Sequence, residues 1–133
     1  YVTIASLGNS QTFGELSVLD VAGNSAASNS TRIIWFGGAS YPTAHSVIQY
    51  ATIATTGNAV KFGDLTANRF NTQATASPTR AVAMGGGIQS PWGDTTNIIE
   101  YVSISTLGDA VDFGDLTVAR NYGGGLSNAH GGL

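Results

Sequence analysis

FGDLTANR, at residues 62–69, returns as FGDLTVAR at residues 113–120 and, less closely, stands as FGELSVLD at residues 13–20. Residues 50–69 and 101–120 are identical at 12 of 20 positions. Other residues recur at the same steps of 49 and then 51 positions: Tyr1, Tyr50 and Tyr101; Ile4, Ile53 and Ile104; Gly8, Gly57 and Gly108; Phe13, Phe62 and Phe113. A repeat of about fifty residues therefore organises the chain, and a period of this size is typical of repeat architectures.

Each period is predicted to hold four short strands. The first is only weakly apolar and falls near residues 72–76. The second is an apolar run closed by a glycine pair, as in TRIIWFGG at residues 31–38 and TRAVAMGG at residues 79–86. The glycine pairs are Gly37 with Gly38 and Gly85 with Gly86. Both apolar runs have the length and composition of buried strands.

The third and fourth strands of a period are predicted to form a hairpin. Residues 47–53 and 98–104 are almost continuously apolar, which suits a strand that is covered on both faces. Residues 57–58 (Gly-Asn) and 108–109 (Gly-Asp) are then expected to turn the chain, since Gly and Asn accept a positive φ at low steric cost. The FGDL block is the returning strand.

Repeated four-stranded antiparallel sheets of this length are typical of β-propeller blades. Stacked blades favour small side chains on both faces, which agrees with the 18 glycines and the low charge of this chain. We predict an all-β fold in which residues 1–133 form one segment of about three blades, with repeats starting near Tyr1, Tyr50 and Tyr101. Propellers close with about 4 to 8 blades, so we expect a longer polypeptide or homo-oligomerisation to complete the ring.

The repeat resembles the kelch repeat of galactose-oxidase-like propellers. The residues that carry this resemblance are Arg32, Gly37, Gly38 and Tyr50 in one copy and Arg80, Gly85, Gly86 and Tyr101 in the next. The match departs at Phe62 and Phe113, where kelch repeats usually have Trp, and at Asp20, where the other two copies have Arg69 and Arg120. The tandem pattern YxTIxxxGNAxxFGDLTxAR is also similar to repeats in predicted bacteriophage fibre proteins.

Composition narrows the function classes. The chain has five Lys or Arg against eight Asp or Glu, a net charge of −3, and so offers no basic surface for a nucleic acid. It has no Cys, which excludes disulfides, thiolate metal sites and a Cys nucleophile. No apolar run approaches the ~18 residues of a membrane span. We expect no nucleic-acid partner and no membrane insertion.

Catalytic chemistry is not predicted. Three carboxylates recur in the FGDL block, Glu15, Asp64 and Asp115, but the repeat separates them into different blades. We expect them to bind backbone amides or the arginines at 69 and 120. The two histidines, His45 and His130, lack the spacing of a metal site. The copper centre of galactose oxidase requires a Cys, so that chemistry does not carry over, and we predict no cofactor, no metal and no enzyme.

The loops after the glycine pairs are the candidate binding site. Residues 39–46 and 88–96 differ in length and content while their flanks agree, and variable loops on a fixed scaffold commonly carry recognition. Aromatic side chains beside polar ones suit stacking on a sugar ring. The candidate ligand-binding residues are Tyr41, His45, Trp92, Asp94 and Thr95. The alternative for Trp92 is that it only covers a blade edge, and Trp35 is expected in the core.

Three functions remain open at the level of sequence. The first is a non-enzymatic structural and receptor-binding module of a phage tail fibre or extracellular adhesin, located in the virion or outside the cell and contacting glycans through its loops. The second is a kelch-like scaffold that binds a protein on the same loops. The third, a glycan-acting hydrolase or lyase, requires a pair of carboxylates in one pocket, which the repeat does not supply.

Overall fold

The computed structural model describes residues 1–18, 22–88 and 94–127, and these residues form strands and loops without a helix. A first sheet contains β1 (Ser25–Ser28), β2 (Arg32–Phe36), β5 (Val47–Thr52) and β6 (Val60–Asp64) in the order β1-β2-β5-β6. All three pairings in this sheet are antiparallel. The all-β prediction is confirmed, and no helix of the described part is long and apolar enough to span a membrane.

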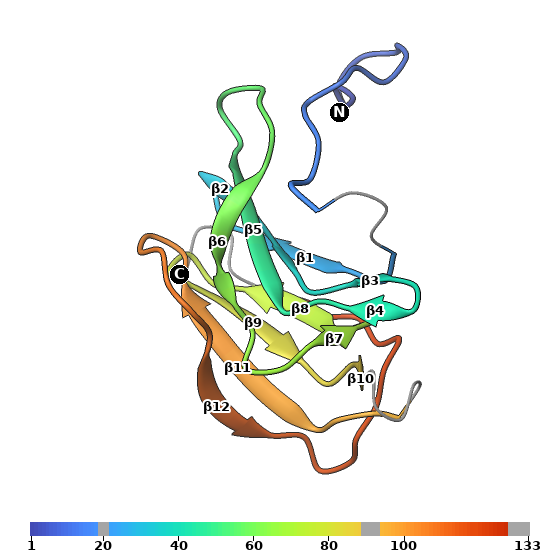
Figure 1. Ribbon diagram of the computed structural model, residues 1–133. Helices are drawn as coiled ribbons and strands as arrows, with labels where there is room; N and C mark the ends of the chain where they lie inside the picture. Colours follow the sequence, from blue (N-terminus) through green and yellow to red (C-terminus); the bar gives the residue numbers. More distant parts are fainter. Residues whose placement is uncertain (19–21, 89–93, 128–133) are drawn as a thin grey trace.

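A second sheet has the same design. It contains β8 (Gln73–Ala76), β9 (Arg80–Met84), β11 (Ile98–Ser103) and β12 (Val111–Asp115), again antiparallel and ordered by sequence. Two small pairs lie beside the large sheets in Figure 1: β3 (Ala39–Ser40) with β4 (Thr43–Ala44), and β7 (Arg69–Phe70) with β10 (Gly87–Ile88). Neither large sheet closes into a barrel among the described residues.

The glycine pairs end β2 and β9 for a backbone reason. Gly37 and Gly38 have φ values of 54° and 112°, and Gly85 and Gly86 have values of 57° and 108°. These lie in the left-handed region that side chains other than glycine rarely adopt. The turn lets the amide of Gly38 donate to the carbonyl of Arg69 at 2.8 Å. The chain therefore leaves each sheet at the same place and in the same direction.

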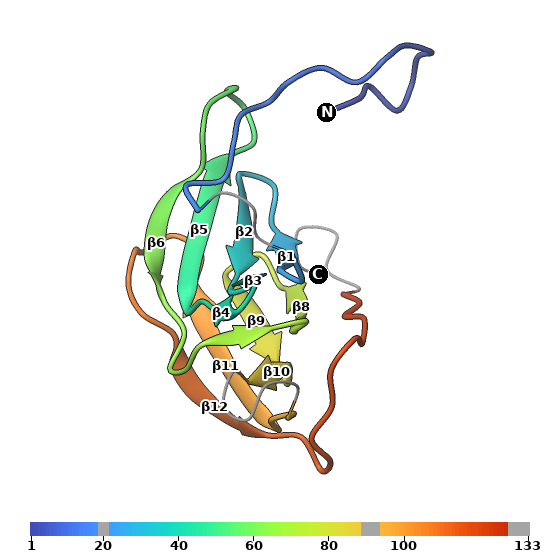
Figure 2. The same cartoon turned by 45° about the vertical axis from the view of Figure 1, so that its right-hand side comes forward.

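The core lies between the two large sheets, which face each other in Figures 1 and 2. From the first sheet and the residue after it come large side chains: Ile34, Phe36, Ile48, Phe62 and Leu65. From the second sheet and its loops come smaller ones: Ala81, Ala83, Val102, Ile104 and Ala110. Alternation along a strand sends neighbouring residues to the opposite face. Each sheet therefore has one face in this core and one facing away from it.

Two predicted segments do not form strands. Residues 1–18, which we name the N-terminal segment, carry the first copies of the Tyr and Phe strands but have no strand assignment. The amide of Gln11 donates to the carbonyl of Tyr1 at 2.9 Å, yet a lone hairpin without flanking strands is only marginally stable. Residues 122–127 stand one repeat after the weakly apolar strand predicted near residues 72–76, so the same strand is expected there, but they are also irregular. Among residues 1–18, 22–88 and 94–127, neither segment has the neighbouring strand that pairs with its counterpart in the two sheets.

Candidate functional site

The repeated block decides how one sheet rests on the next. Gly63, in the FGDL block of β6, lies against the loop before β12, where a Cβ on Gly63 would come 2.1 Å from the carbonyl oxygen of Gly108. The neighbouring amide of Asp64 donates a hydrogen bond to Oδ1 of Asp109 in the same loop, at 2.9 Å. Gly63 is thus required for the close approach of the two backbones, and the dipeptide at residues 63–64 contacts the one at residues 108–109 of the adjacent sheet.

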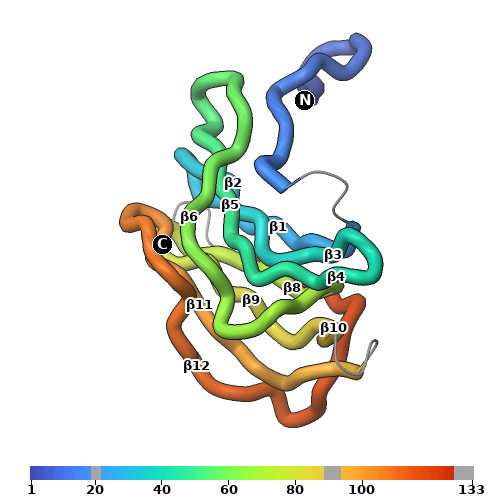
Figure 3. The backbone as a smooth tube through the Cα atoms, viewed as in Figure 1, coloured from blue at the N-terminus to red at the C-terminus, as the bar shows by residue number. Residues whose placement is uncertain are grey.

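The same contact joins the N-terminal segment to the first sheet. A Cβ on Gly14 would lie 2.0 Å from the carbonyl oxygen of Gly57, and the amide of Glu15 donates to Oδ1 of Asn58 at 3.0 Å. Figure 3 shows this segment rising beside the loop between β5 and β6. Residues 57–58 and 108–109 were predicted as tight hairpin turns. They lie in the loops between β5 and β6 and between β11 and β12, where they also contact the N-terminal segment and the first sheet, respectively. Gly57 has no positive φ, whereas Gly108 has a φ of 156°.

A buried ion pair crosses the interface between the two sheets. Arg69 and Glu100 pair with both side chains 0% exposed, and Glu100 also accepts a hydrogen bond from the amide of Thr66 at 2.9 Å. Nη1 of Arg69 donates to the carbonyl of Gly85 at 2.8 Å. Burial lowers the pKa of Arg69 to about 10, so it is still protonated at neutral pH. Removal of either partner would leave a buried charge.

Asp64 was predicted to bind backbone amides or Arg69, and neither partner is observed among the described residues. Asp64 instead forms an ion pair with Lys61 at 2.5 Å and accepts a hydrogen bond from Ser46 at 3.2 Å. Arg69 turns away because β7 continues along the adjacent sheet, where it pairs with β10. Its carboxylate therefore comes from the next repeat, at a residue that the motif comparison did not single out.

The first interface replaces this ion pair with neutral groups. Gln49 occupies the position of Glu100 and is 1% exposed, and its Oε1 accepts hydrogen bonds from the amide and hydroxyl of Ser17 at 2.5 and 2.6 Å. In the sequence, Asp20 stands where Arg69 stands in the next repeat. A cation therefore pairs with an acid at one interface, whereas the amide of Gln49 binds Ser17 at the other. Asp20 itself lies outside the described residues. One polar residue inside an apolar strand was the feature that could have revealed both positions.

The aromatic residues of the repeat form one contact three times. Tyr1 with Phe13, Tyr50 with Phe62, and Tyr101 with Phe113 meet edge to face, with ring centroids 6.1, 5.7 and 5.8 Å apart. The arginines at the start of β2 and β9 cover two of these tyrosines. The guanidinium carbons of Arg32 and Arg80 each lie 4.7 Å from the ring centroids of Tyr50 and Tyr101. Arg32 and Arg80 therefore cover the second and third of these Tyr–Phe pairs.

Two sheet faces are open in the described chain. On the second sheet, Phe113 is 58% exposed, whereas its counterpart Phe62 is 4% exposed. On the first sheet, a groove of about 440 Å³ separates the sheet from the N-terminal segment, and its walls include Phe13, Ile33 and Trp35. Trp35 is thus half-buried on the open side of β2 and is not a fully enclosed core residue.

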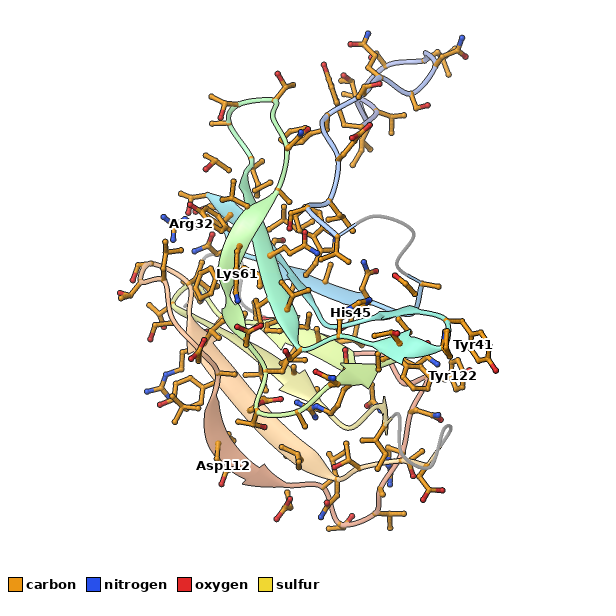
Figure 4. The ribbon with its side chains drawn as sticks, viewed as in Figure 1. Arg32, Tyr41, His45, Lys61, Asp112 and Tyr122 are labelled. Carbon is orange, nitrogen blue, oxygen red and sulfur yellow. The ribbon has the colours of Figure 1, made fainter. Side chains whose placement is uncertain are left out.

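The predicted ligand residues are only partly described. Tyr41, at the turn between β3 and β4, is 80% exposed. Figure 4 shows it at the edge of the molecule, beside the label of Tyr122. Asp94 and Thr95 are exposed in the loop after β10. His45 is half-buried, and its Nε2 lies 3.2 Å from Oγ of Ser40. Trp92 and His130 lie outside the described residues.

The loops belong to the same end of both sheets. The β3–β4 pair holds Tyr41, and the amide of His45 donates to the carbonyl of Gly38 at 2.8 Å. The equivalent bond in the second repeat joins the amide of Thr96 to the carbonyl of Gly86 at 2.9 Å. The two loops are therefore fixed to the glycine pairs in the same way. Tyr122, 78% exposed and with φ 55°, is an aromatic residue that the loop comparison missed.

No catalytic arrangement stands out among these groups. In the described residues, no three His, Asp or Glu side chains lie close enough to hold a metal ion. Asp64 is engaged by Lys61 and Ser46, whereas Glu15 and Asp115 are exposed. The interactions observed among the described residues are hydrogen bonds, a buried ion pair and apolar contacts.

Comparisons with known proteins add information about the fold alone. No protein-family model matches the chain, and no curated protein sequence matches it. Solved structures do match, among them the structure of a protein named YjhT, with a TM-score of 0.65 and 13% sequence identity. The match covers 78% of this chain and 35% of YjhT, so this chain spans about a third of that protein.

Proposed function

We propose that the chain is a non-enzymatic segment of a β-propeller and acts as a structural module with a recognition surface on its loops. The observation that supports this is the repetition of one interface. Gly14 against Gly57 and Gly63 against Gly108 make the same backbone contact, each followed by an amide bonded to an Asn or Asp side chain. An interface used twice in one chain suits a protein that extends by stacking sheets.

The open faces support the same proposal. Large apolar side chains such as Phe113 and Val111 are more than half exposed on β12, and the groove on the first sheet is lined mainly by apolar residues. Exposed apolar surfaces of this kind usually mark interaction sites. We infer that further blades, or identical chains, cover them in a virion fibre or an extracellular adhesin of kelch-like construction.

Imaging of the assembled particle by electron cryomicroscopy tests the architecture. The expected result is a ring in which residues 25–64 and 73–115 are neighbouring blades. An assembly in which these two segments are separated, or in which each forms part of a closed barrel, contradicts the proposal.

A glycan array tests the recognition surface. Tyr41→Ala is expected to lower glycan affinity about tenfold, because stacking of a tyrosine ring on a sugar contributes roughly 1 kcal/mol or more. Tyr1→Ala is the matched control, since Tyr1 is also exposed but lies in the N-terminal segment away from the loops. Equal glycan binding by the wild type and the Tyr41 variant would show that Tyr41 is not part of a glycan site. Binding of a protein in place of a glycan would support a kelch-like scaffold.

A further inference from the structure

One arginine of the repeat lacks the environment of its counterpart. Arg69 is buried and paired with Glu100 across the sheet interface. Arg120 stands at the same position of the next repeat, and its backbone carbonyl accepts a hydrogen bond from Gly86 at 2.9 Å just as that of Arg69 accepts one from Gly38 at 2.8 Å. Arg120 is nevertheless exposed, and its Nε donates to the carbonyl of Val118 at 3.3 Å.

The surface around Arg120 repeats the rest of the buried interface. Gly63 has the carbonyl of Gly108 against it, while Gly114 has no atom within 4 Å of its Cβ position. Phe62 is 4% exposed, while Phe113 is 58% exposed. We name this surface, formed by Phe113, Gly114, Leu116 and Arg120, the outer face of the second sheet. It has the groups needed for a third interface, without the neighbouring sheet.

We propose that the outer face of the second sheet binds a further sheet of the same repeat, and that this sheet carries a glutamate that pairs with Arg120. This inference rests on the proposed stacking function and specifies the partner. In the existing interface, the carboxylate of Glu100 serves both Arg69 and the amide of Thr66. The new carboxylate has the same two tasks, at the guanidinium of Arg120 and the amide of Thr117.

Charge complementarity distinguishes this partner from a second copy of the chain presenting its first sheet. That sheet carries Gln49, a neutral amide, at the position of the required glutamate. A guanidinium buried without a counter-charge is strongly destabilising. Oε1 of Gln49 is also already engaged by Ser17 of the N-terminal segment. The first sheet of another copy is therefore a poor match for Arg120, whereas a sheet built like the second one matches it.

Duplication of one repeat within the chain supplies such a sheet. A second copy of residues 72–122 is inserted directly after Tyr122, which keeps every native residue and places the duplicate of Glu100 opposite Arg120. Hydrogen exchange is then measured at the amides of Asp115 and Thr117 of the first copy. Both are expected to exchange about 100-fold more slowly than in the original chain. Each would then have a side-chain acceptor, as the amides of Asp64 and Thr66 have in Asp109 and Glu100.

A double-mutant cycle in the extended chain tests the ion pair itself. Arg120→Gln in the first copy is combined with Glu→Gln at the duplicate of Glu100. The Arg120→Gln change is expected to raise the unfolding equilibrium constant at least about tenfold more when the glutamate is present than when it is glutamine. The Arg69 and Glu100 pair in the same protein, changed in the same way, is the reference cycle.

The outcomes separate the two proposals. Protected amides on β12 with additive substitutions overturn the glutamate partner and leave stacking intact. Unprotected amides, or an extended chain that does not fold, overturn stacking too, because the duplicate provides every contact that it needs. If Arg69→Gln and Glu100→Gln are additive in the original chain, the template for the glutamate partner is itself absent and the inference is wrong.

Discussion

Gly63 and Glu100 show how much single residues contribute to this structure. Gly63 lets two backbones approach until its Cβ position lies 2.1 Å from the carbonyl oxygen of Gly108. Glu100 neutralises a guanidinium that has no access to water. Gly63 cannot be replaced by a larger residue without a clash, because there is no space for a Cβ atom. Glu100 cannot be replaced by a neutral residue without leaving the buried Arg69 unpaired.

Gly63→Ala is expected to destabilise the protein by about 1–3 kcal/mol, because the added methyl group forces the sheets apart. Chemical denaturation measures the change. Gly57→Ala is the matched control: Gly57 also lies at a sheet contact, but its Cβ position has no atom within 4 Å and its φ is not positive. Equal losses in the two variants would show that loss of glycine itself, and not the close approach, is responsible.

Glu100→Gln is expected to lower the free energy of unfolding by about 3–5 kcal/mol, because Arg69 then remains buried and charged without its partner. The midpoint of urea unfolding measures it. Asp115→Asn removes an exposed carboxylate and serves as the control, with an expected change within about 0.5 kcal/mol. A Glu100→Gln protein as stable as the wild type contradicts the assignment of the ion pair.

At the scale of the element, β6 and β12 share a sequence but not an environment. Both run from Val through Phe and Gly to Asp, both pair with the preceding strand, and both pairings shift register at the same point, between Ile48 and Gln49 and between Ile99 and Glu100. A bulge changes which way the following side chains point. The two strands differ in what covers them: the second sheet covers β6, whereas β12 is exposed among the described residues.

This difference predicts unequal effects for one substitution made twice. Phe62→Ala is expected to cost about 3–5 kcal/mol, as for other buried aromatic residues. Phe113→Ala is expected to cost less than about 1 kcal/mol, because the ring is 58% exposed and contacts mainly Tyr101. Thermal unfolding of the two variants side by side makes the comparison. Equal losses would mean that the outer face is covered in solution.

At the scale of the whole molecule, the sheets depend on one another. The shared core takes large side chains from the first sheet and smaller ones from the second, so the first sheet alone leaves Phe36 and Phe62 in water. The N-terminal segment has no such partner: Ile4 and Leu7 are 99% and 104% exposed. Only the last part of this segment, residues 13–18, is attached to the first sheet, and the bonds include those from the amides of Gly57 and Ala59.

Native-state hydrogen exchange is expected to divide the chain accordingly. Amides of β5, β9 and β11, which lie inside the sheets, exchange only through global unfolding, whereas amides at residues 2–10 exchange within the dead time of the measurement. The amides of Gly57 and Ala59, bonded to the carbonyls of Phe13 and Glu15 at 2.8 Å, are expected between these extremes. Slow exchange at residues 2–10 would show that a further sheet covers the segment.

The sequence determined the repeat, the strands of both full periods and the all-β class. Two copies that agree at 12 of 20 positions must form the same local structure, and the strands near residues 72–76, 79–86 and 98–104 lie where they were predicted. Residues 1–18 carry less exact copies of the Tyr and Phe motifs, and residues 122–127 hold the position of the weakly apolar strand. Both are irregular, because a strand requires partners as well as pattern.

Only the tertiary structure decided which residues join one sheet to another. Arg69 forms its ion pair with Glu100, which lies 31 positions further along the chain in the next repeat, while the nearer carboxylate of Asp64 pairs with Lys61. Local pattern shows which residues recur, and the packing of one sheet on the next decides which of them meet. Pairing between repeats depends on that packing, which the order of residues along the chain does not specify.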